Sequence, residues 1–525
     1  MKHIKQNNVK TSMGTYVVTR RILTTSGDER FLDNKMNLAN RIYNNLTRHY
    51  IDIVNELYKD VWYNHAYEQW QKACSKGDED AADEWGNEIY VCMAGYALTE
   101  YDIHMYAGKG KRQSFDKGMG INIVQKIGSQ LYASIKKAVF RKTKIHFRKF
   151  GSTCSFEDKT AKSGIIYKED EGIVTVMKHD MRLKPVRKND YWMMEALCGK
   201  VKYCRIKREP IHGKYVYFLQ IVMKGHTPAK ISKGNDVVGN DQGVSCTAVV
   251  SDKMVDFFEL AENVDRYTKI INKWAVCYER RRRMANPQCY NADGTIKKGA
   301  VFKNHTAGMQ YALMQLKAAY RKRTVYIRQS HGHLTNIILD NAGIIIKEPM
   351  NYRALAKKSK TVASKTSRSS VVRNNKTGKT TKIYKFKRRK RFFKSILKRS
   401  PGLFNSLLEQ KAKRYGISIV DVNIKEYRAS QYDHCRNIYL KHELSQRTRI
   451  VGNHIVQRDL YSAFLLYCNK DVDTVDIDKC NFYFRYFLKA QGIVVNKMLK
   501  HKDTTKNFGL SDFIKRSGSH RKAVA

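Results

Sequence analysis

The chain has 525 residues, and its 99 lysine and arginine residues against 48 aspartate and glutamate residues give a formal net charge of +51. Solubility needs only a few net charges, and an excess this large would repel itself in a folded protein unless a polyanion neutralised much of it. Nucleic acid is the polyanion that we expect, because phosphate contacts supply salt-dependent affinity. The sequence has no long apolar run and no lipidation motif, which argues against a membrane partner.

The stretch MKHIKQNNVK lacks the apolar core of a signal peptide, so we expect a cytoplasmic protein of a prokaryotic cell. The eleven cysteines fit that compartment, since they form no CxxC pair and are scattered as an odd number along the chain. We expect most of them to be buried, reduced thiols. The 42% hydrophobic content and only six prolines indicate folded domains rather than disorder.

The first half of the chain alternates between strand and helix patterns. Residues 14–24 alternate β-branched side chains and predict a strand, whereas 31–64 repeat apolar residues every three or four positions and predict one long amphipathic helix. Helical periodicity continues with breaks to about residue 140. Residues 164–225 then have the alternation of antiparallel hairpins. A helical block is therefore predicted to interrupt a β domain, which is an antiparallel sheet or a barrel.

The second half begins with a strand, a glycine-containing turn and another strand over 233–252. Residues 264–340 predict two long, very basic helices, and the wholly apolar strand NAGIIIKEPM follows them. No aspartate or glutamate then occurs until Glu409. A single charge run is most simply a solvated face, but several unbalanced runs interleaved with tyrosine and phenylalanine favour a phosphate-contacting surface. The candidates for nucleic-acid contact are Arg280, Arg281, Arg282, Arg283, Arg321, Arg323, Lys387, Arg388, Arg389, Lys390 and Arg391.

Three acidic residues stand at the ends of apolar segments. Asp241 follows a Val-Val pair, Glu348 ends the run IIIK, and Asp459 opens the apolar helix LYSAFLLYC. Each has a simple structural explanation by itself, as a turn residue, as the point where a strand reaches solvent, and as a helix N-cap. Together they occur in the order in which an RNase H-like sheet presents its acids, separated by the basic helices.

Carboxylates in that order suit one kind of chemistry. In-line attack on a phosphodiester uses Mg²⁺ ions that contact the scissile phosphate, and clustered carboxylates hold such hard cations through oxygen. Histidine or cysteine would select softer metals. If the sheet brings Asp241, Glu348 and Asp459 together, the sequence therefore predicts a metal-dependent nuclease site.

Three motifs around these acids resemble those of the compact type V CRISPR effector nucleases and their transposon-encoded TnpB relatives. VVGNDQGVS is similar to their first RuvC motif, IIIKEPMNYRAL to the second and QRDLYSAFLL to the third, while LLEQKAKRYGISIVDVNIKEYRASQ resembles the stretch between the last two. The match covers roughly residues 230–470 by motif, and residues 1–230 match the family only in layout. Asn240 and Gln242 depart from the apolar residues usual beside the first acid, and Tyr461 replaces a usual asparagine.

The resemblance implies an α/β multidomain protein with a split, RNase H-like RuvC nuclease domain. The implied domains are a wedge-like β-barrel (1–30 and 141–232), a helical recognition domain (31–140), the RuvC domain with its basic helices (233–429 and 455–525), and a nucleic-acid loading segment (430–454). It further implies a guide RNA, double-stranded target DNA next to a short flanking motif, and cleavage at Asp241, Glu348 and Asp459 with two Mg²⁺ ions. A monomer or a homodimer on RNA is expected.

The loading segment departs from the family, whose ribbon has two CxxC pairs at this place. Asp433, Arg436, Arg449 and Gly452 occupy those four positions. A substitute set of Cys435, His434, His442 and His454 fits no common zinc spacing, because His434 and Cys435 are adjacent. We therefore expect no structural zinc and a ribbon held by packing.

Three other functions remain open on sequence grounds. The first is a guide-RNA-dependent DNA-binding repressor with little or no cleavage, against which the retention of all three acids counts. The second is a guide-independent, structure-selective nuclease. A structural RNA-binding protein accounts for the charge but leaves the order of the three motifs unexplained.

Overall fold

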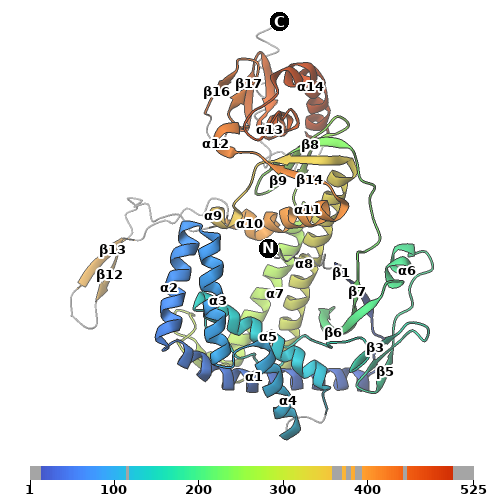
Figure 1. Cartoon of the computed structure of the whole chain (residues 1–525), viewed down its shortest axis with the longest axis vertical. Coiled ribbons are helices and arrows are strands. Elements are labelled where there is room, and N and C mark those ends of the chain that lie inside the picture. The colour runs from blue at the N-terminus through green and yellow to red at the C-terminus, as the bar shows by residue number, and fades with distance from the viewer. Residues whose placement is uncertain are drawn as a thin grey trace, which may run out of the picture. The chain divides into compact units, whose positions relative to one another are not determined.

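A computed structural model describes residues 14–113, 118–356, 369–373, 380–384, 393–441 and 446–499 (Figure 1). The chain divides into two compact units, Met1–Pro228 and Ala229–Ala525. None of the helices in the described residues carries an apolar stretch of the length that crossing a bilayer requires.

The first unit opens with strand β1 (Thr15–Arg21), which is followed by a helical block. The helices are α1 (Ser26–Leu57), α2 (Val61–Lys76), α3 (Glu79–Gly95), α4 (Glu100–Gln113) and α5 (Ile121–Arg141). Thr25 and Asp28 form a capping box at the start of α1, which satisfies backbone donors in its first turn. The single helix predicted over 31–64 is wrong in its extent, because a second helix begins at Val61 after its own N-cap, Asp60.

Strands return after α5 and form two antiparallel sheets. They are β2 (Ser155–Glu157), β3 (Ile165–Lys168), β4 (Ile173–Val176), β5 (His179–Arg182), β6 (Val201–Ile211) and β7 (Lys214–Lys224), with helix α6 (Tyr191–Leu197) before β6. One sheet has the order β1-β7-β6-β2 and the other the order β3-β4-β5. The strands predicted within 164–225 thus form hairpins, with β1 added at the sheet edge. Their hydrogen bonds describe open sheets, so closure into a wedge-like barrel stays a prediction.

The second unit is built around a five-stranded sheet with the order β10-β9-β8-β11-β14. Its strands are β8 (Asp236–Gln242), β9 (Cys246–Val250), β10 (Val255–Glu259), β11 (Ala342–Lys347) and β14 (Ser418–Asp421). β8, β9 and β10 form an antiparallel meander, and β11 runs parallel to both β8 and β14. The carboxyl ends of the three parallel strands therefore meet at one edge of the sheet.

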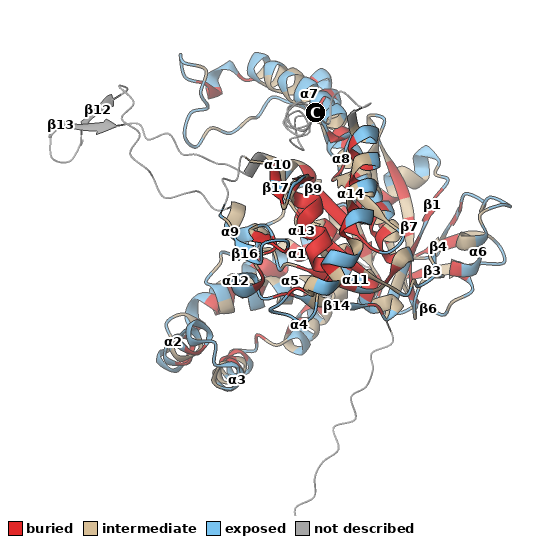
Figure 2. Cartoon of the chain, turned by 90° about the horizontal axis from the view of Figure 1, so that it is seen from above, coloured by how far each residue is buried: buried red, intermediate tan, exposed pale blue. Residues whose placement is uncertain are grey.

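Helices cover both faces of this sheet. Basic helices α7 (Val264–Ala285) and α8 (Ala307–Asn341) pack on each other, and α8 and α11 (Pro401–Tyr415) pack on one face. Helix α13 (Arg458–Tyr467) covers the other face, backed by α14 (Ile477–Leu499), and α13 is buried along almost its whole length (Figure 2). The remaining elements are η1 (Pro287–Cys289), α9 (Tyr352–Ala356), β12 (Ser369–Arg373), β13 (Thr380–Tyr384), α10 (Phe393–Arg399) and α12 (Ile424–Tyr427).

The predicted loading segment folds into two short hairpins directly before α13. The first pairs β15 (Tyr432–Asp433) with β16 (Ile438–Tyr439), and the second pairs β17 (Thr448–Val451) with β18 (His454–Gln457). They are separate two-stranded sheets without backbone pairing to each other. Contacts between side chains and backbone must therefore hold them together.

Candidate active site

Asp241, Glu348 and Asp459 line one cavity of about 480 Å³ in the second unit. Asp241 is the last residue but one of β8, Glu348 directly follows β11, and Asp459 is the second residue of α13. The sheet and α13 thus bring together three acids that are far apart in the sequence, as the order of the motifs predicts.

The register of two parallel strands sets the first two acids side by side. Lys347 at the end of β11 is paired with Asn240 on β8, so Glu348 emerges next to Asp241 at the same edge of the sheet. Side chains alternate between the faces of a strand, so Lys347 and Asn240 point to the opposite face from the two acids. There Lys347 is almost fully buried and forms ion pairs with Glu409 and Asp421.

Gly239 allows the third acid to approach. A Cβ atom at this position would lie 2.1 Å from the backbone oxygen of Ala463 and 2.4 Å from the backbone nitrogen of Tyr467, both on α13. Only glycine therefore permits this close packing of α13 on β8. The packing places the first turn of α13, and Asp459 with it, at the edge of the sheet where Asp241 lies.

Two of the three simple structural explanations fail. Asp241 lies in the ladder opposite Ala248 rather than in a turn, whereas Glu348 directly follows its strand and is half-buried at the cavity. The N-cap of α13 is Gln457, whose side-chain oxygen accepts a hydrogen bond from the backbone nitrogen of Leu460 at 2.7 Å. The Asp459 carboxylate is therefore not used for capping.

The acids repel one another in a partly buried cavity. Burial, followed by the negative charges of Asp459 and Glu348, raises the pKa of Asp241 well above its ordinary value, against the opposing effect of Arg458 and Arg447. Burial also raises the pKa of Glu348, although a hydrogen bond from the backbone of Ala429 counteracts it. Mutual repulsion of this kind is relieved when a cation binds between the carboxylates.

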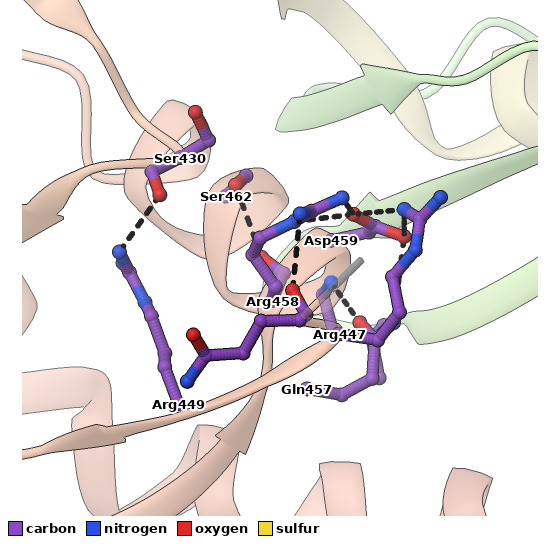
Figure 3. Close-up of polar contacts among 9 residues, drawn as sticks. Ser430, Arg447, Arg449, Gln457, Arg458, Asp459 and Ser462 are labelled. Atoms are coloured by element: carbon purple, nitrogen blue, oxygen red, sulfur yellow. Dashed lines mark hydrogen bonds and ion pairs between the residues drawn. The ribbon is translucent and has the colours of Figure 1, made fainter. Parts of the chain in front are cut away.

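Two arginines hold Asp459 in this structure (Figure 3). Nη1 of Arg447 lies 3.0 Å from Oδ2 and 3.2 Å from Oδ1 of Asp459. Arg458 donates from Nη2 and Nε to Oδ1 at 3.1 and 3.2 Å. Together with Lys441, which also lines the cavity, they place three cations beside three carboxylates. Sequence analysis missed all three, although each lies within 20 positions of Asp459.

The three carboxylates are chemically suitable ligands for magnesium. The three acids offer carboxylate oxygens to one cavity, and such oxygens are the ligands that Mg²⁺ prefers. Among the described residues, however, no three histidine, cysteine, aspartate or glutamate side chains stand close enough to share an ion. Gathering them around Mg²⁺ requires a shift of these side chains and the release of Asp459 from at least one guanidinium.

The basic residues predicted to contact nucleic acid have mixed surroundings. Arg280 on α7 is exposed, whereas Arg281, Arg282 and Arg283 bind, respectively, the backbone oxygen of Gly308, the side chains of Glu279 and Tyr290, and the backbone oxygen of Gly294. Arg282 and Arg283 thus also hold the end of α7 to the loop that follows it, and Arg281 holds it to the start of α8.

On α8, Arg323 donates to the backbone oxygens of Leu397 and Lys398 at 2.7 and 3.3 Å. Arg321 lines a surface groove between α7 and α8 together with the stacked pair Tyr267 and Tyr326. Lys387, Arg388, Arg389, Lys390 and Arg391 lie outside the described residues.

The four positions where the family's ribbon has cysteines hold residues with different surroundings. Asp433 and Arg449 are buried, Arg436 is exposed, and Gly452 has a left-handed backbone with φ of 57°. Of the substitute metal set, His434 hydrogen-bonds Tyr461, and His442 lies outside the described residues.

No protein-family model matches the chain, and no curated protein is significantly similar to it. Among solved structures, the chain is similar to a Cas12f1–sgRNA–target DNA complex, with 12% identity, a TM-score of 0.43, and coverage of 87% of this chain and 99% of that one. A CRISPR–Cas12f ternary complex has 11% identity and a TM-score of 0.24, with coverage of 87% and 100%. A Cas12i–crRNA–double-stranded DNA complex has 11% identity and a TM-score of 0.24, with coverage of 77% and 57%. The chain is thus similar to solved Cas12 complexes.

Proposed function

We propose that this chain is an RNA-guided DNA endonuclease that cuts DNA strands at the cavity of Asp241, Glu348 and Asp459. The observation that carries the proposal is the convergence of these acids, from three distant motifs, on one cavity that three cations also line. The strand order β10-β9-β8-β11-β14, an antiparallel meander followed by two parallel strands, supports an RNase H-like domain.

The three acids would hold two Mg²⁺ ions, and magnesium supplies Lewis-acid stabilisation of the charge on the scissile phosphate. Lys441, Arg447 and Arg458 would attract the phosphodiester into the cavity and offset its charge. The partial burial of the carboxylates lowers the local dielectric constant, which strengthens their interaction with any cation that enters.

A guide RNA is proposed from the motif resemblance together with the net charge of +51. A folded RNA and its heteroduplex with DNA would neutralise much of this excess, and base pairing would supply specificity. The β domain of 1–30 and 141–232 and the helical block of 31–140 would grip the RNA and the flanking duplex. The basic helices α7 and α8 would follow the guide backbone, and the hairpins of 430–454 would lead single strands to the cavity.

One observation favours a second candidate, a guide-dependent DNA-binding repressor with little or no cleavage. Asp459 is paired with two guanidiniums, and the acids are not gathered for metal binding as they stand. An enzyme that had lost cleavage would tolerate such a neutralised cavity.

The experiment that separates the two starts from the RNA retained by the purified protein. Sequencing this RNA identifies the guide, and a plasmid carrying the matching target is then incubated with the complex in Mg²⁺ or in a chelator. The nuclease predicts a cut plasmid in Mg²⁺ alone. An intact plasmid that stays bound to the complex would establish the repressor, and cleavage after removal of the RNA would establish a guide-independent nuclease.

A further inference from the structure

The two hairpins before α13 are joined by a buried arginine. Arg449 on β17 is 3% exposed, and its two terminal nitrogens donate to backbone oxygens of the other hairpin. Nη1 lies 3.0 Å from the oxygen of Ser430, and Nη2 lies 2.7 Å from that of Tyr432. Because the hairpins share no backbone ladder, this fork replaces the pairing that a continuous sheet would provide.

The same guanidinium rests on the helix that carries the third acid. Its central carbon lies 4.3 Å from the centroid of the Tyr461 ring, a cation–π distance, and Tyr461 stands two residues after Asp459 on α13. The Tyr461 hydroxyl in turn lies 2.6 Å from Nδ1 of His434, on the first hairpin. Arg449 and Tyr461 thus connect both hairpins to one turn of α13.

The negative charge of the buried Asp433 favours the charged form of Arg449, although the two side chains form no ion pair. Asp433 is 2% exposed, and its Oδ1 accepts hydrogen bonds from the backbone nitrogens of Cys435 and Arg436 at 3.0 and 3.3 Å, which fixes the turn of the first hairpin. Within the described residues, Oδ2 of Asp433 and Nε of Arg449 are buried without a hydrogen-bond partner. Burial lowers the pKa of Arg449 to about 10, so it stays charged at neutral pH.

Gly452 completes the packing at the tip of the second hairpin. A Cβ atom there would lie 3.2 Å from Sγ of Cys435, so the glycine leaves room for the first hairpin to approach. Three of the four residues that replace the ribbon cysteines, Asp433, Arg449 and Gly452, therefore take part in one packed cluster.

We propose that Arg449, seated on Tyr461 and offset by Asp433, is a side-chain staple that holds the two hairpins on α13 without a metal. It acts as a positioning residue, because the staple fixes β17, which Arg447 directly precedes, and the turn of α13 that carries Asp459. The staple itself follows from the contacts alone, whereas its effect on cleavage rests on the proposed nuclease function.

Hydrogen–deuterium exchange of the complete protein tests the staple. Arg449→Met leaves two carbonyls unsatisfied and Asp433 without its counter-charge, and it is expected to speed exchange across residues 430–457 on the order of a hundredfold. Arg436→Met is the matched control, since the Arg436 side chain is exposed and the backbone nitrogen that binds Asp433 is unchanged by the substitution. Exchange in β8 and β11 reports whether the sheet remains folded.

If Arg449→Met does not fold, Arg449→Lys decides, because lysine keeps the charge but lacks the fork. The staple predicts faster exchange confined to 430–457 in this variant, and native exchange after treatment of the native protein with a zinc chelator. Unchanged exchange in Arg449→Lys, or a loss of protection when the native protein is treated with the chelator, would overturn the staple.

Cleavage by the native protein and by the Arg449 variants is then compared at equal guide-RNA retention. A native cleavage rate combined with faster exchange would overturn the positioning role alone, and cleavage absent from native protein would count against the nuclease but not the staple.

Discussion

Nη1 of Arg447 lies 3.0 Å from Oδ2 of Asp459, so the third acid of the cavity is paired with a cation of the chain itself. Because of this pairing, Asp459 is not free to bind a metal ion as it stands. The pairing also places a guanidinium, the side-chain group best suited to phosphate, beside the carboxylate. Arg447 is about one-third exposed, so its side chain has room to turn from the acid towards an incoming strand.

The first prediction concerns this competition. In Arg447→Ala, Asp459 loses one of its two guanidinium partners, so the Mg²⁺ concentration that gives half-maximal cleavage is expected to fall. The rate at saturating Mg²⁺ is expected to fall by about 10- to 100-fold, because the phosphate loses a charged partner. Titration of Mg²⁺ in cleavage assays measures both values, with Arg436→Ala as the control. An increased Mg²⁺ requirement would show that Arg447 does not compete for Asp459.

The second prediction concerns the cost of holding buried acids together. The pKa of Asp241 is raised in the folded state. An acid with a raised folded-state pKa adds to the free energy of unfolding at low pH, and this contribution is lost as the pH rises through that pKa. At neutral pH in a chelator, Asp241→Asn is therefore expected to raise the melting temperature. Calorimetry compares it with Asp473→Asn at an exposed position, which should leave the melting temperature unchanged. A lower melting temperature for Asp241→Asn would contradict the repulsion.

The third prediction concerns the contact of α13 with β8. Gly239→Ala drives a methyl group into the α13 backbone and is expected to destabilise the second unit by about 3 kcal/mol. Gly492→Ala is the control, since a Cβ atom there has no neighbour within 4 Å and alanine favours the helix. Urea unfolding gives both values. A neutral Gly239→Ala would mean that α13 does not approach β8 as closely as described.

The fourth prediction concerns His434. Burial, with the opposing effect of Asp433, lowers its pKa to about 4, so the folded state disfavours protonation there. The contribution of His434 to the free energy of unfolding is fully present above its unfolded-state pKa of about 6.5, and it is lost as the pH falls towards 4. Between pH 7 and pH 5 its share of the free energy of unfolding should drop by roughly 2 kcal/mol.

His434→Asn tests this share, because the asparagine oxygen can accept the Tyr461 hydroxyl bond without titrating in this range. The variant should lose less stability than the native protein between pH 7 and pH 5 in urea unfolding. Equal losses would mean that His434 is not held neutral.

The sequence predicted the position of the three acids because their neighbours constrain them locally. Asp241 and Glu348 end apolar strands and Asp459 begins an apolar helix, so the motifs mark all three acids. Their convergence depends on the register of β11 with β8 and on the packing of α13 on β8. The strand-turn-strand of 233–252 and the two basic helices were predictable for the same reason, since their hydrophobic periods are strong.

What the sequence did not reveal depends on distant partners. The pairing of Arg447 with Asp459 and the fork of Arg449 on Ser430 and Tyr432 depend on how two hairpins fold back on α13. The arginine run at 280–283 looks like one solvent-facing surface, yet three of its members bind groups in the loop and helix that follow. Periodicity does not encode such contacts, and it also missed the break between α1 and α2, where Asp60 caps a new helix.

The most direct test of the central claim is cleavage of a guide-matched DNA target in Mg²⁺ by the complete protein with its retained RNA, compared among the native chain, Asp241→Asn, Glu348→Gln and Asp459→Asn. Asp473→Asn serves as the control. The nuclease assignment predicts that each of the three cavity variants still binds RNA and target but loses cleavage by at least about 1,000-fold, whereas the control cuts as the native chain does. Cleavage at the native rate by any of the three would contradict the assignment of that acid, and native rates in all three would show that DNA is cut elsewhere.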